Sequence, residues 1–238
     1  MELTIFLDDG GVMNDNRVRG AQWPDLLGEF LAPILGSTPE AWAEANRAVA
    51  SSLWGGLQAE LRRDCRDFED FQRRYDLAWL GGMCGHVGVE PPSEAEALHL
   101  TERANRHVTP RIRAALPGAI PAVADLRARG ITLHTASGES SLELAGYLEG
   151  MGVLGHFGHL FGPDLVGYWK EGSAYYARIF ASAGVDPAAA LVADDSPDAV
   201  RWALQAGAQA VLVGAGPEHT PPGARAIAAL ADLPGLLG

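Results

Sequence analysis

Short apolar runs alternate with amphipathic segments over much of the chain. Buried strands are predicted for residues 3–7, 131–135, 190–193 and 210–213, which are compact runs of Leu, Ile, Val, Ala and Phe with a few threonines. Helices are predicted for residues 117–129, 141–149, 173–183 and 197–205, with Gly130 and Gly184 as stop signals. This alternation predicts an α/β fold with a doubly wound parallel sheet, in which ligands bind beyond the carboxyl ends of the strands.

Residues 16–110 have helical periodicity and no strand pattern. Thr38 before Pro39 is expected to cap one helix, and Ser93 with Glu96 has the spacing of a capping box for another. We therefore predict a helical domain, residues 16–110, inserted into an α/β core formed by residues 1–15 and 111–238. A loop is expected around His156 and His159, and a loop followed by one short helix after Gly214.

Composition excludes several classes of function. The formal net charge of −12 argues against binding to nucleic acid or to an anionic membrane surface. Cys65 and Cys84 are too few for a disulfide framework, and no apolar run has the roughly 18 residues that a membrane helix needs. A cytoplasmic protein is expected, and nothing in the sequence indicates its oligomeric state.

Polar residues that could take part in a reaction or bind an ion lie at the ends of the predicted strands. They are Asp8 and Asp9 after the first strand, Thr135 and Ser137 at the second, and Asp194 and Asp195 after a later one. Carboxylates at one sheet edge repel each other unless a cation lies among them, and Mg²⁺ prefers such oxygen ligands. Lys170, the only lysine among eighteen basic residues, precedes a helix between these strands. A lysine and a hydroxyl beside a cation would form a cradle for an anion.

These residues also resemble the motifs of the haloacid dehalogenase superfamily. The first motif, an apolar strand followed by D-x-D-G-V-L-x-D, is similar to Leu7-Asp8-Asp9-Gly10-Gly11-Val12-Met13-Asn14-Asp15. Thr135 stands where the second motif has Ser or Thr, and Lys170 where the third has lysine. The acidic fourth motif resembles Asp194-Asp195-Ser196-Pro197. An insertion between the first two motifs is what the family calls a C1 cap.

The resemblance implies a Mg²⁺-dependent hydrolase that acts on a small phosphorylated metabolite. Asp8 would be the nucleophile that forms an aspartyl-phosphate, with Thr135 and Lys170 holding the phosphoryl oxygens. Asp8, the backbone carbonyl of Gly10 and Asp195 would hold the metal, and Asp194 would be a further ligand or an orienting group. The candidates for substrate binding are Asp9, Gly11, Ser137, Asp15, Asn16 and Arg17.

Gly10 departs from the family pattern, because the family's phosphatases have at this position an Asp that protonates the leaving group. Asp9 is a poor substitute, since neighbouring residues of a strand point to opposite faces. One alternative is a substrate with a good leaving group, or an acid supplied by Asp15 or by His86, His99 or His107. A second is a weakened relative that binds a phosphorylated ligand or a protein partner without turnover.

A haloacid dehalogenase is a third alternative, since these relatives also lack the second Asp. The pair Asp194-Asp195 counts against it, because dehalogenases work without metal and do not keep an acidic pair there. A phosphonatase is close to excluded, because its cap lysine has no counterpart in residues 16–110.

Overall fold

The computed structural model describes residues 3–238 and contains two compact units. The core unit comprises Met1–Val18 and Arg113–Gly238, and the helical unit comprises Arg19–Ile112. The sequence had suggested a helical insertion at residues 16–110. Each unit is described by itself below.

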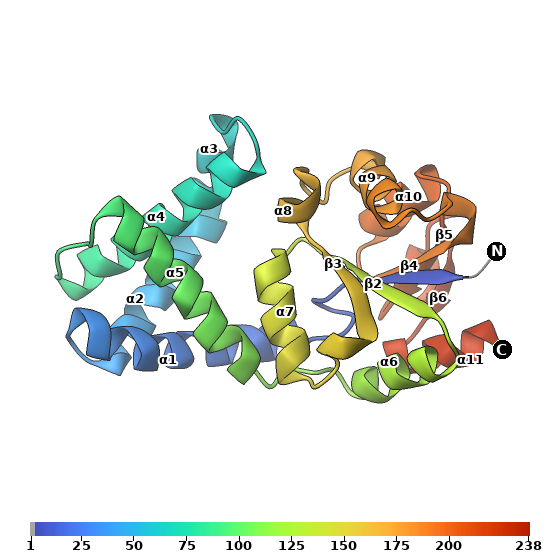
Figure 1. The fold of residues 1–238 in the computed structure, drawn as a ribbon, viewed down its shortest axis with the longest axis horizontal. Coiled ribbons are helices and arrows are strands. Elements are labelled where there is room, and N and C mark those ends of the chain that lie inside the picture. Colours follow the sequence, from blue (N-terminus) through green and yellow to red (C-terminus); the bar gives the residue numbers. More distant parts are fainter. Residues whose placement is uncertain (1–2) are drawn as a thin grey trace. The chain divides into compact units, whose positions relative to one another are not determined.

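The core unit is built on a six-stranded sheet with the order β3-β2-β1-β4-β5-β6, in which every pair is parallel (Figure 1). The strands are β1 Thr4–Leu7, β2 Thr132–Ala136, β3 Phe157–Phe161, β4 Ala190–Asp194, β5 Gln209–Val213 and β6 Arg225–Ile227. The helices are α6 Ala119–Ala128, α7 Ser141–Gly150, α8 Pro163–Val166, α9 Ser173–Ala183, α10 Pro197–Gln205 and α11 Leu233–Leu237. This confirms the predicted α/β fold with a doubly wound parallel sheet.

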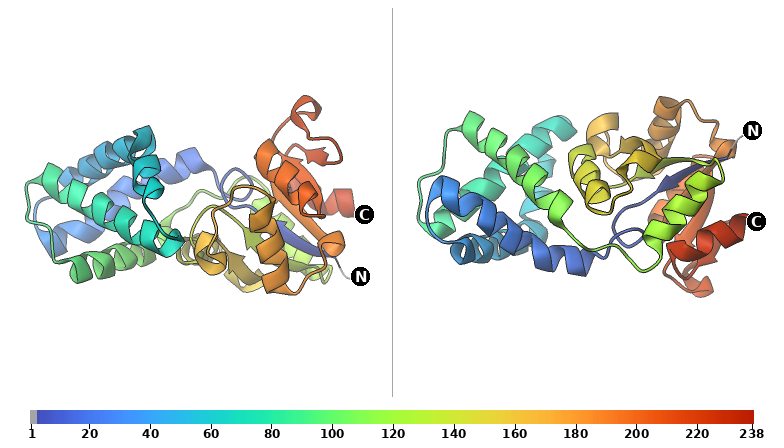
Figure 2. Two further views of the ribbon diagram at one scale, coloured as in Figure 1. Left: turned by 90° about the horizontal axis from the view of Figure 1, so that it is seen from above. Right: turned by 60° about the horizontal axis from the view of Figure 1, so that its bottom comes forward.

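Both faces of the sheet are covered, which explains why its central strands are apolar on both sides. On one face Ile5, Leu7 and Leu191 pack against α6, α7 and α11. On the other face Phe6 and Val192 pack against α9 and α10. Helices α6 and α11 lie side by side (Figure 2), where Arg129 donates a hydrogen bond of 2.8 Å to the Pro234 carbonyl.

The sequence prediction missed the two edge strands, β3 and β6. Residues 157–161 form β3 rather than a loop, and the segment after Gly214 contains β6 before its short helix. Strand β3 has two exposed residues, Gly158 and His159, and an irregular register with β2. An edge strand has a neighbouring strand on one side only and is partly exposed to water. It can therefore carry more polar and small residues than a central strand, which weakens the apolar pattern in the sequence.

The helical unit contains most of α1 Asn16–Leu35, which begins in the core unit, and the whole of α2 Pro39–Ser52, α3 Gln58–Arg63, α4 Phe68–Val87 and α5 Glu94–Val108. A π-helical turn, Leu53–Leu57, joins α2 to α3. Thr38 caps α2 through the Ala41 N–H, and Ser93 with Glu96 forms the capping box of α5, as the sequence predicted. The side chains of Trp42, Leu80 and Met83 are fully buried in this unit.

Among the described residues, no helix combines the length and apolar character needed to cross a membrane.

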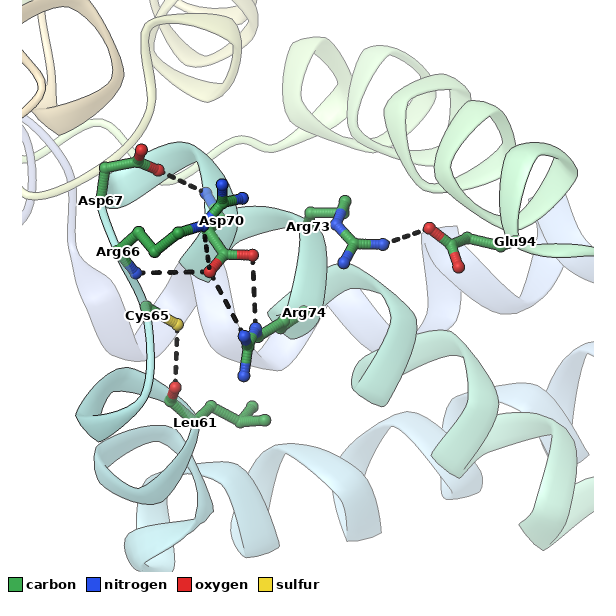
Figure 3. Close-up of polar contacts among 8 residues, drawn as sticks. All are labelled: Leu61, Cys65, Arg66, Asp67, Asp70, Arg73, Arg74 and Glu94. Atoms are coloured by element: carbon green, nitrogen blue, oxygen red, sulfur yellow. Dashed lines mark hydrogen bonds and ion pairs between the residues drawn. The ribbon is translucent and has the colours of Figure 1, made fainter.

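Asp70 ties the beginning of α4 to the preceding loop (Figure 3). Its buried carboxylate accepts hydrogen bonds from the Arg66 backbone N–H and from the Arg74 guanidinium, both near 3.3 Å. The Arg66 N–H first, and then Arg74, hold the pKa of Asp70 below its ordinary value despite burial. On the same helix Arg73 forms an ion pair with Glu94 of α5. These contacts connect the N-terminal part of α4 to the preceding loop and to α5.

Candidate functional site

The strand register brings Asp8 and Asp194 to the same place at the sheet edge. Leu7 is paired with both Thr135 of β2 and Ala193 of β4, and the Asp8 N–H continues the ladder to the Ala193 carbonyl at 3.0 Å. Asp8 is the residue after Leu7, and Asp194 is the residue after Ala193. Because side chains alternate along a strand, both carboxylates project on the same side of the sheet.

Lys170 joins these two carboxylates. Its Nζ lies 2.8 Å from Asp8 Oδ1 and 2.7 Å from Asp194 Oδ2, and all three side chains are largely buried. Lys170 is in the loop between α8 and α9. An ammonium between two buried carboxylates offsets the free-energy cost of taking them out of water.

Burial and the attraction between opposite charges shift the pKa values of these side chains. Burial raises the pKa of Asp8 to about 7, and Lys170 opposes that rise. Burial also disfavours the charged form of Lys170, but Asp8 and Asp194 outweigh it and hold the pKa of the ammonium well above its ordinary value. Burial and the neighbouring Asp194 raise the pKa of Asp195. Lys170 therefore stays charged, whereas Asp8 would be fully ionised near neutral pH only with additional positive charge.

Asp194 is held from three sides. Its Oδ1 accepts a hydrogen bond of 3.0 Å from the Ser196 backbone N–H, and its Oδ2 accepts one of 3.3 Å from the Tyr176 hydroxyl besides the Lys170 contact. These contacts suit an orienting role for Asp194, which here would act on Lys170.

Asp195 lies against the turn that follows β1. Gly11 has φ of 81°, and a Cβ added to it would overlap the Asp195 carboxylate, so both the backbone and the space require glycine. Asp8, Asp194 and Asp195 can each present one carboxylate oxygen with all three atoms within 4.8 Å of one another. A set of hard oxygen donors at this spacing fits Mg²⁺.

Asp9 points to the opposite side from Asp8. Its side chain is fully buried and accepts a hydrogen bond of 2.6 Å from Asn14 Nδ2, while its carbonyl accepts from the N–H groups of Met13 and Asn14. Asn14 also contacts Met151 Sδ, which belongs to the core on that face of the sheet. Asp9 therefore stabilises the turn, and its placement lends no support to the predicted role in substrate binding.

The first residues of α1 follow directly from this turn. Asp15 Oδ1 accepts hydrogen bonds from the N–H groups of Arg17 and Val18, at 2.8 and 3.2 Å, so Asp15 caps the helix. Asn16 and Arg17 are exposed. The Asn16 carboxamide reaches back to Gly10, where it would meet any added Cβ.

Thr135 is the second-last residue of β2 and Ser137 directly follows the strand, and both are buried. The Thr135 hydroxyl donates to the Phe161 carbonyl at 3.2 Å, and the Ser137 hydroxyl accepts from the Glu139 N–H at 3.2 Å. The sheet register places Thr135 beside Leu7, one residue before Asp8. Both hydroxyls thus lie at the carboxyl end of the sheet, as the carboxylates do, and each forms a hydrogen bond with the backbone.

Two buried tyrosines were not singled out from the sequence. Tyr176 contacts Asp194, and the Tyr175 hydroxyl donates to the Ser137 carbonyl at 2.8 Å. Their positions in the first turn of a helix just after Lys170 were a usable signal, because a buried tyrosine hydroxyl needs a polar partner.

Comparison with models of known protein families gives a match over most of the chain. The model described as haloacid dehalogenase-like hydrolase matches residues 27–207. This segment contains Lys170, Asp194 and Asp195, and it begins after Asp8. No curated protein sequence matches the chain significantly.

Solved structures with the same fold include enzymes with different chemistry. The HAD-hydrolase YfnB from Bacillus subtilis bound to magnesium has a TM-score of 0.64 and 17% identity, over 100% of this chain and 99% of that one. L-2-haloacid dehalogenase from Xanthobacter autotrophicus has a TM-score of 0.61 and 18% identity, over 100% and 98%. HAD phosphatase from Thermococcus onnurineus has a TM-score of 0.61 and 22% identity, over 100% and 98%. At these identities the comparison shows the fold alone.

Proposed function

We propose, because this chain belongs to the haloacid dehalogenase-like hydrolase family, that it is a Mg²⁺-dependent phosphatase of a small phosphorylated metabolite. The observation that carries the proposal is the group formed by Asp8, Lys170, Asp194 and Asp195 at the carboxyl ends of β1 and β4. An enzyme that removes halide needs no such set of metal-binding carboxylates, so Asp195 favours phosphoryl transfer.

Asp8 would act as the nucleophile in two displacements. In the first, an Asp8 carboxylate oxygen forms a bond to phosphorus as the bond from phosphorus to the leaving oxygen breaks, which leaves an aspartyl-phosphate. In the second, water attacks that phosphorus, the bond to Asp8 breaks, and inorganic phosphate departs. Mg²⁺ held by Asp8, Asp195 and the Gly10 carbonyl would neutralise the negative charge that nucleophile and phosphate bring together.

Lys170 would stabilise the charge that builds up on the phosphoryl oxygens, since its ammonium is fixed beside Asp8 at 2.8 Å. Asp194 and Tyr176 would keep that ammonium in place. Thr135 and Ser137 are predicted to offer hydroxyl donors at the same edge. The helical unit would act as the cap that selects the substrate, and Asn16 and Arg17 are the substrate-binding candidates in the first turn of α1.

The test is hydrolysis of p-nitrophenyl phosphate, whose leaving group needs no proton. We expect turnover that requires Mg²⁺, is abolished by EDTA, and falls at least about 10³-fold in Asp8→Asn, because the amide cannot attack phosphorus. Asp25→Asn, which removes an exposed carboxylate paired with Arg47, is the matched control and should keep full activity. Full activity in Asp8→Asn would refute the proposal.

A binding protein without turnover is the second candidate, favoured by the glycine at position 10. It predicts no release of phosphate from any ester, together with a rise in Tm when inorganic phosphate and Mg²⁺ are added. Release of chloride from 2-chloropropionate in the presence of EDTA would instead indicate dehalogenase chemistry.

A further inference from the structure

Gly10 is not required by the backbone. Its φ lies outside the left-handed region, unlike that of Gly11, so an L-residue could adopt the same conformation. What distinguishes position 10 is then the space that a side chain would occupy.

The Asn16 carboxamide fills that space. A Cβ built on Gly10 would meet Asn16 Oδ1 first, with Nδ2 at 2.8 Å and Cγ at 3.0 Å. All three atoms belong to the end of the Asn16 side chain. A side chain at position 10 and the present conformation of Asn16 thus exclude each other.

Short hydrogen bonds hold the two residues in this relation. The turn between them is closed by the Gly11 N–H to the Asn14 carbonyl at 2.8 Å and by the Met13 N–H to the Asp9 carbonyl at 2.8 Å. The Asp15 N–H is bonded to the Ala114 carbonyl at 2.7 Å, and the Asp15 carboxylate caps α1. Neither backbone can retreat without breaking these bonds, so the conflict falls on the side chains.

We propose that Asn16 occupies the space that a side chain at position 10 would need, so that Gly10 and Asn16 together set the substrate class. The inference rests on the proposed phosphatase function. A carboxamide donates and accepts hydrogen bonds but does not transfer a proton at neutral pH. The site then serves phosphates whose leaving group departs without protonation, such as aryl phosphates and acyl phosphates, and it discriminates against alkyl phosphates.

A stability cycle tests the shared space without any substrate. Because the atoms that an added Cβ would meet are the end of an exposed side chain, Gly10→Ala should lower Tm by at most a few degrees, and by less when Asn16 is also replaced by Ala. Gly20→Ala, in α1 where an added Cβ meets nothing within 4 Å, is the control and should leave Tm unchanged or raise it. Additive effects of Gly10→Ala and Asn16→Ala on Tm would overturn the proposal.

A kinetic cycle tests the chemistry with a series of phosphates of increasing leaving-group pKa. In the wild type, kcat/KM should fall steeply along the series. The double variant Gly10→Asp with Asn16→Ala should gain about 10² or more on an alkyl phosphate, the usual contribution of a general acid. Asn16→Ala alone should gain nothing, and Gly10→Asp alone should gain less than the double variant, because the Asn16 carboxamide occupies the space that the new carboxyl needs.

Equal gains in Gly10→Asp and in the double variant would contradict the role of Asn16, as would a flat dependence on leaving group in the wild type. Failure of the proposed function has a different signature, in which Asp8→Asn hydrolyses aryl phosphate as well as the wild type. In that case the Tm cycle still reports on Gly10 and Asn16.

Discussion

Lys170 is the only lysine among eighteen basic residues, and its ammonium lies between two carboxylates at 2.7–2.8 Å. A compact ammonium can approach both oxygens in a buried space, whereas a planar guanidinium is larger and needs partners in its own plane. The rarity of lysine in this chain was a hint in the sequence that position 170 is special. Which carboxylates it joins depends on the pairing of β1 with β4.

Replacing Lys170 by Met should leave Asp8 and Asp194 facing each other without compensation. We expect the free energy of unfolding in EDTA at pH 8 to fall by about 3 kcal/mol. The loss should be smaller at pH 5.5, because the pKa of Asp8 is raised in the folded protein and a bound proton can replace the ammonium. Urea unfolding at both pH values measures the difference.

Arg106→Met is the matched control, because Arg106 forms an exposed ion pair with Glu102 at 2.9 Å. It should change stability by less than about 1 kcal/mol at either pH. A Lys170→Met protein as stable as this control at pH 8 would show that the buried ion pairs contribute little.

His134 should make stability depend on pH in the acid range. Burial, with a smaller contribution from His159, lowers the pKa of His134 to about 4. The Nδ1 atom of His134 accepts a hydrogen bond of 2.8 Å from the backbone N–H of His159. The unfolded chain takes up a proton near pH 6.5 and the folded protein only near pH 4, so stability is full above pH 6.5 and declines between these values. We expect a loss of about 1–2 kcal/mol after allowing for nearby solvent.

Urea unfolding of wild type and His134→Gln at pH 7, 5.5 and 4 isolates this contribution, since other groups titrate in both proteins. The free-energy difference between the two should shrink as pH falls. A difference that stays constant across the series would exclude His134 as the source.

Helix boundaries belong to the scale of single elements, where local chemistry decides. Thr38, Ser93 and Ser196 each accept or share a hydrogen bond at a helix start, and Gly184 ends α9 with a left-handed conformation. These signals lie within one turn of the helix ends that they specify. That is why α2, α5 and α10 begin, and α9 ends, at the residues predicted from the sequence.

The contact between α1 and α2 depends on Gly28. A Cβ at this position would overlap the Pro39 carbonyl, so we expect Gly28→Ala to destabilise the protein by about 1–3 kcal/mol through overpacking. Gly81→Ala, in α4 where an added Cβ meets nothing within 4 Å, is the matched control and should add about 0.5–1 kcal/mol. Thermal and urea unfolding of both variants provide the comparison, and equal effects would argue against a close approach at Gly28.

At the scale of the whole molecule, carboxylates from two distant parts of the sequence should make stability depend on Mg²⁺. Binding to the folded state alone, at ten times the dissociation constant, contributes about 1.4 kcal/mol. For a chain of this size that raises Tm by about 3–6 °C. Asp195→Ala should abolish the shift.

Asp198→Ala is the control for this experiment, since Asp198 is an exposed acid in the first turn of α10, paired with Arg201. It should retain the Mg²⁺ shift in full. If Asp195→Ala kept the shift as well, the ion would have to bind elsewhere.

Much of this molecule was determined by the sequence alone. The central strands, the main helices and the α/β fold follow from apolar periodicity, caps and stop signals, all of which act over a few residues. The position of Asp8, Thr135, Asp194 and Asp195 at strand ends follows from the same pattern. Edge strands β3 and β6 escaped prediction because partial exposure weakens that pattern.

Only the tertiary structure decided how these residues are paired. The strand order places β1 between β2 and β4, and from this follow the Lys170 bridge, the Tyr176 contact with Asp194 and the burial of Asp9 on the opposite face. The filling of the space beside Gly10 by Asn16 is likewise a matter of side-chain placement. Contacts of this kind depend on register and packing between segments, which no local pattern specifies.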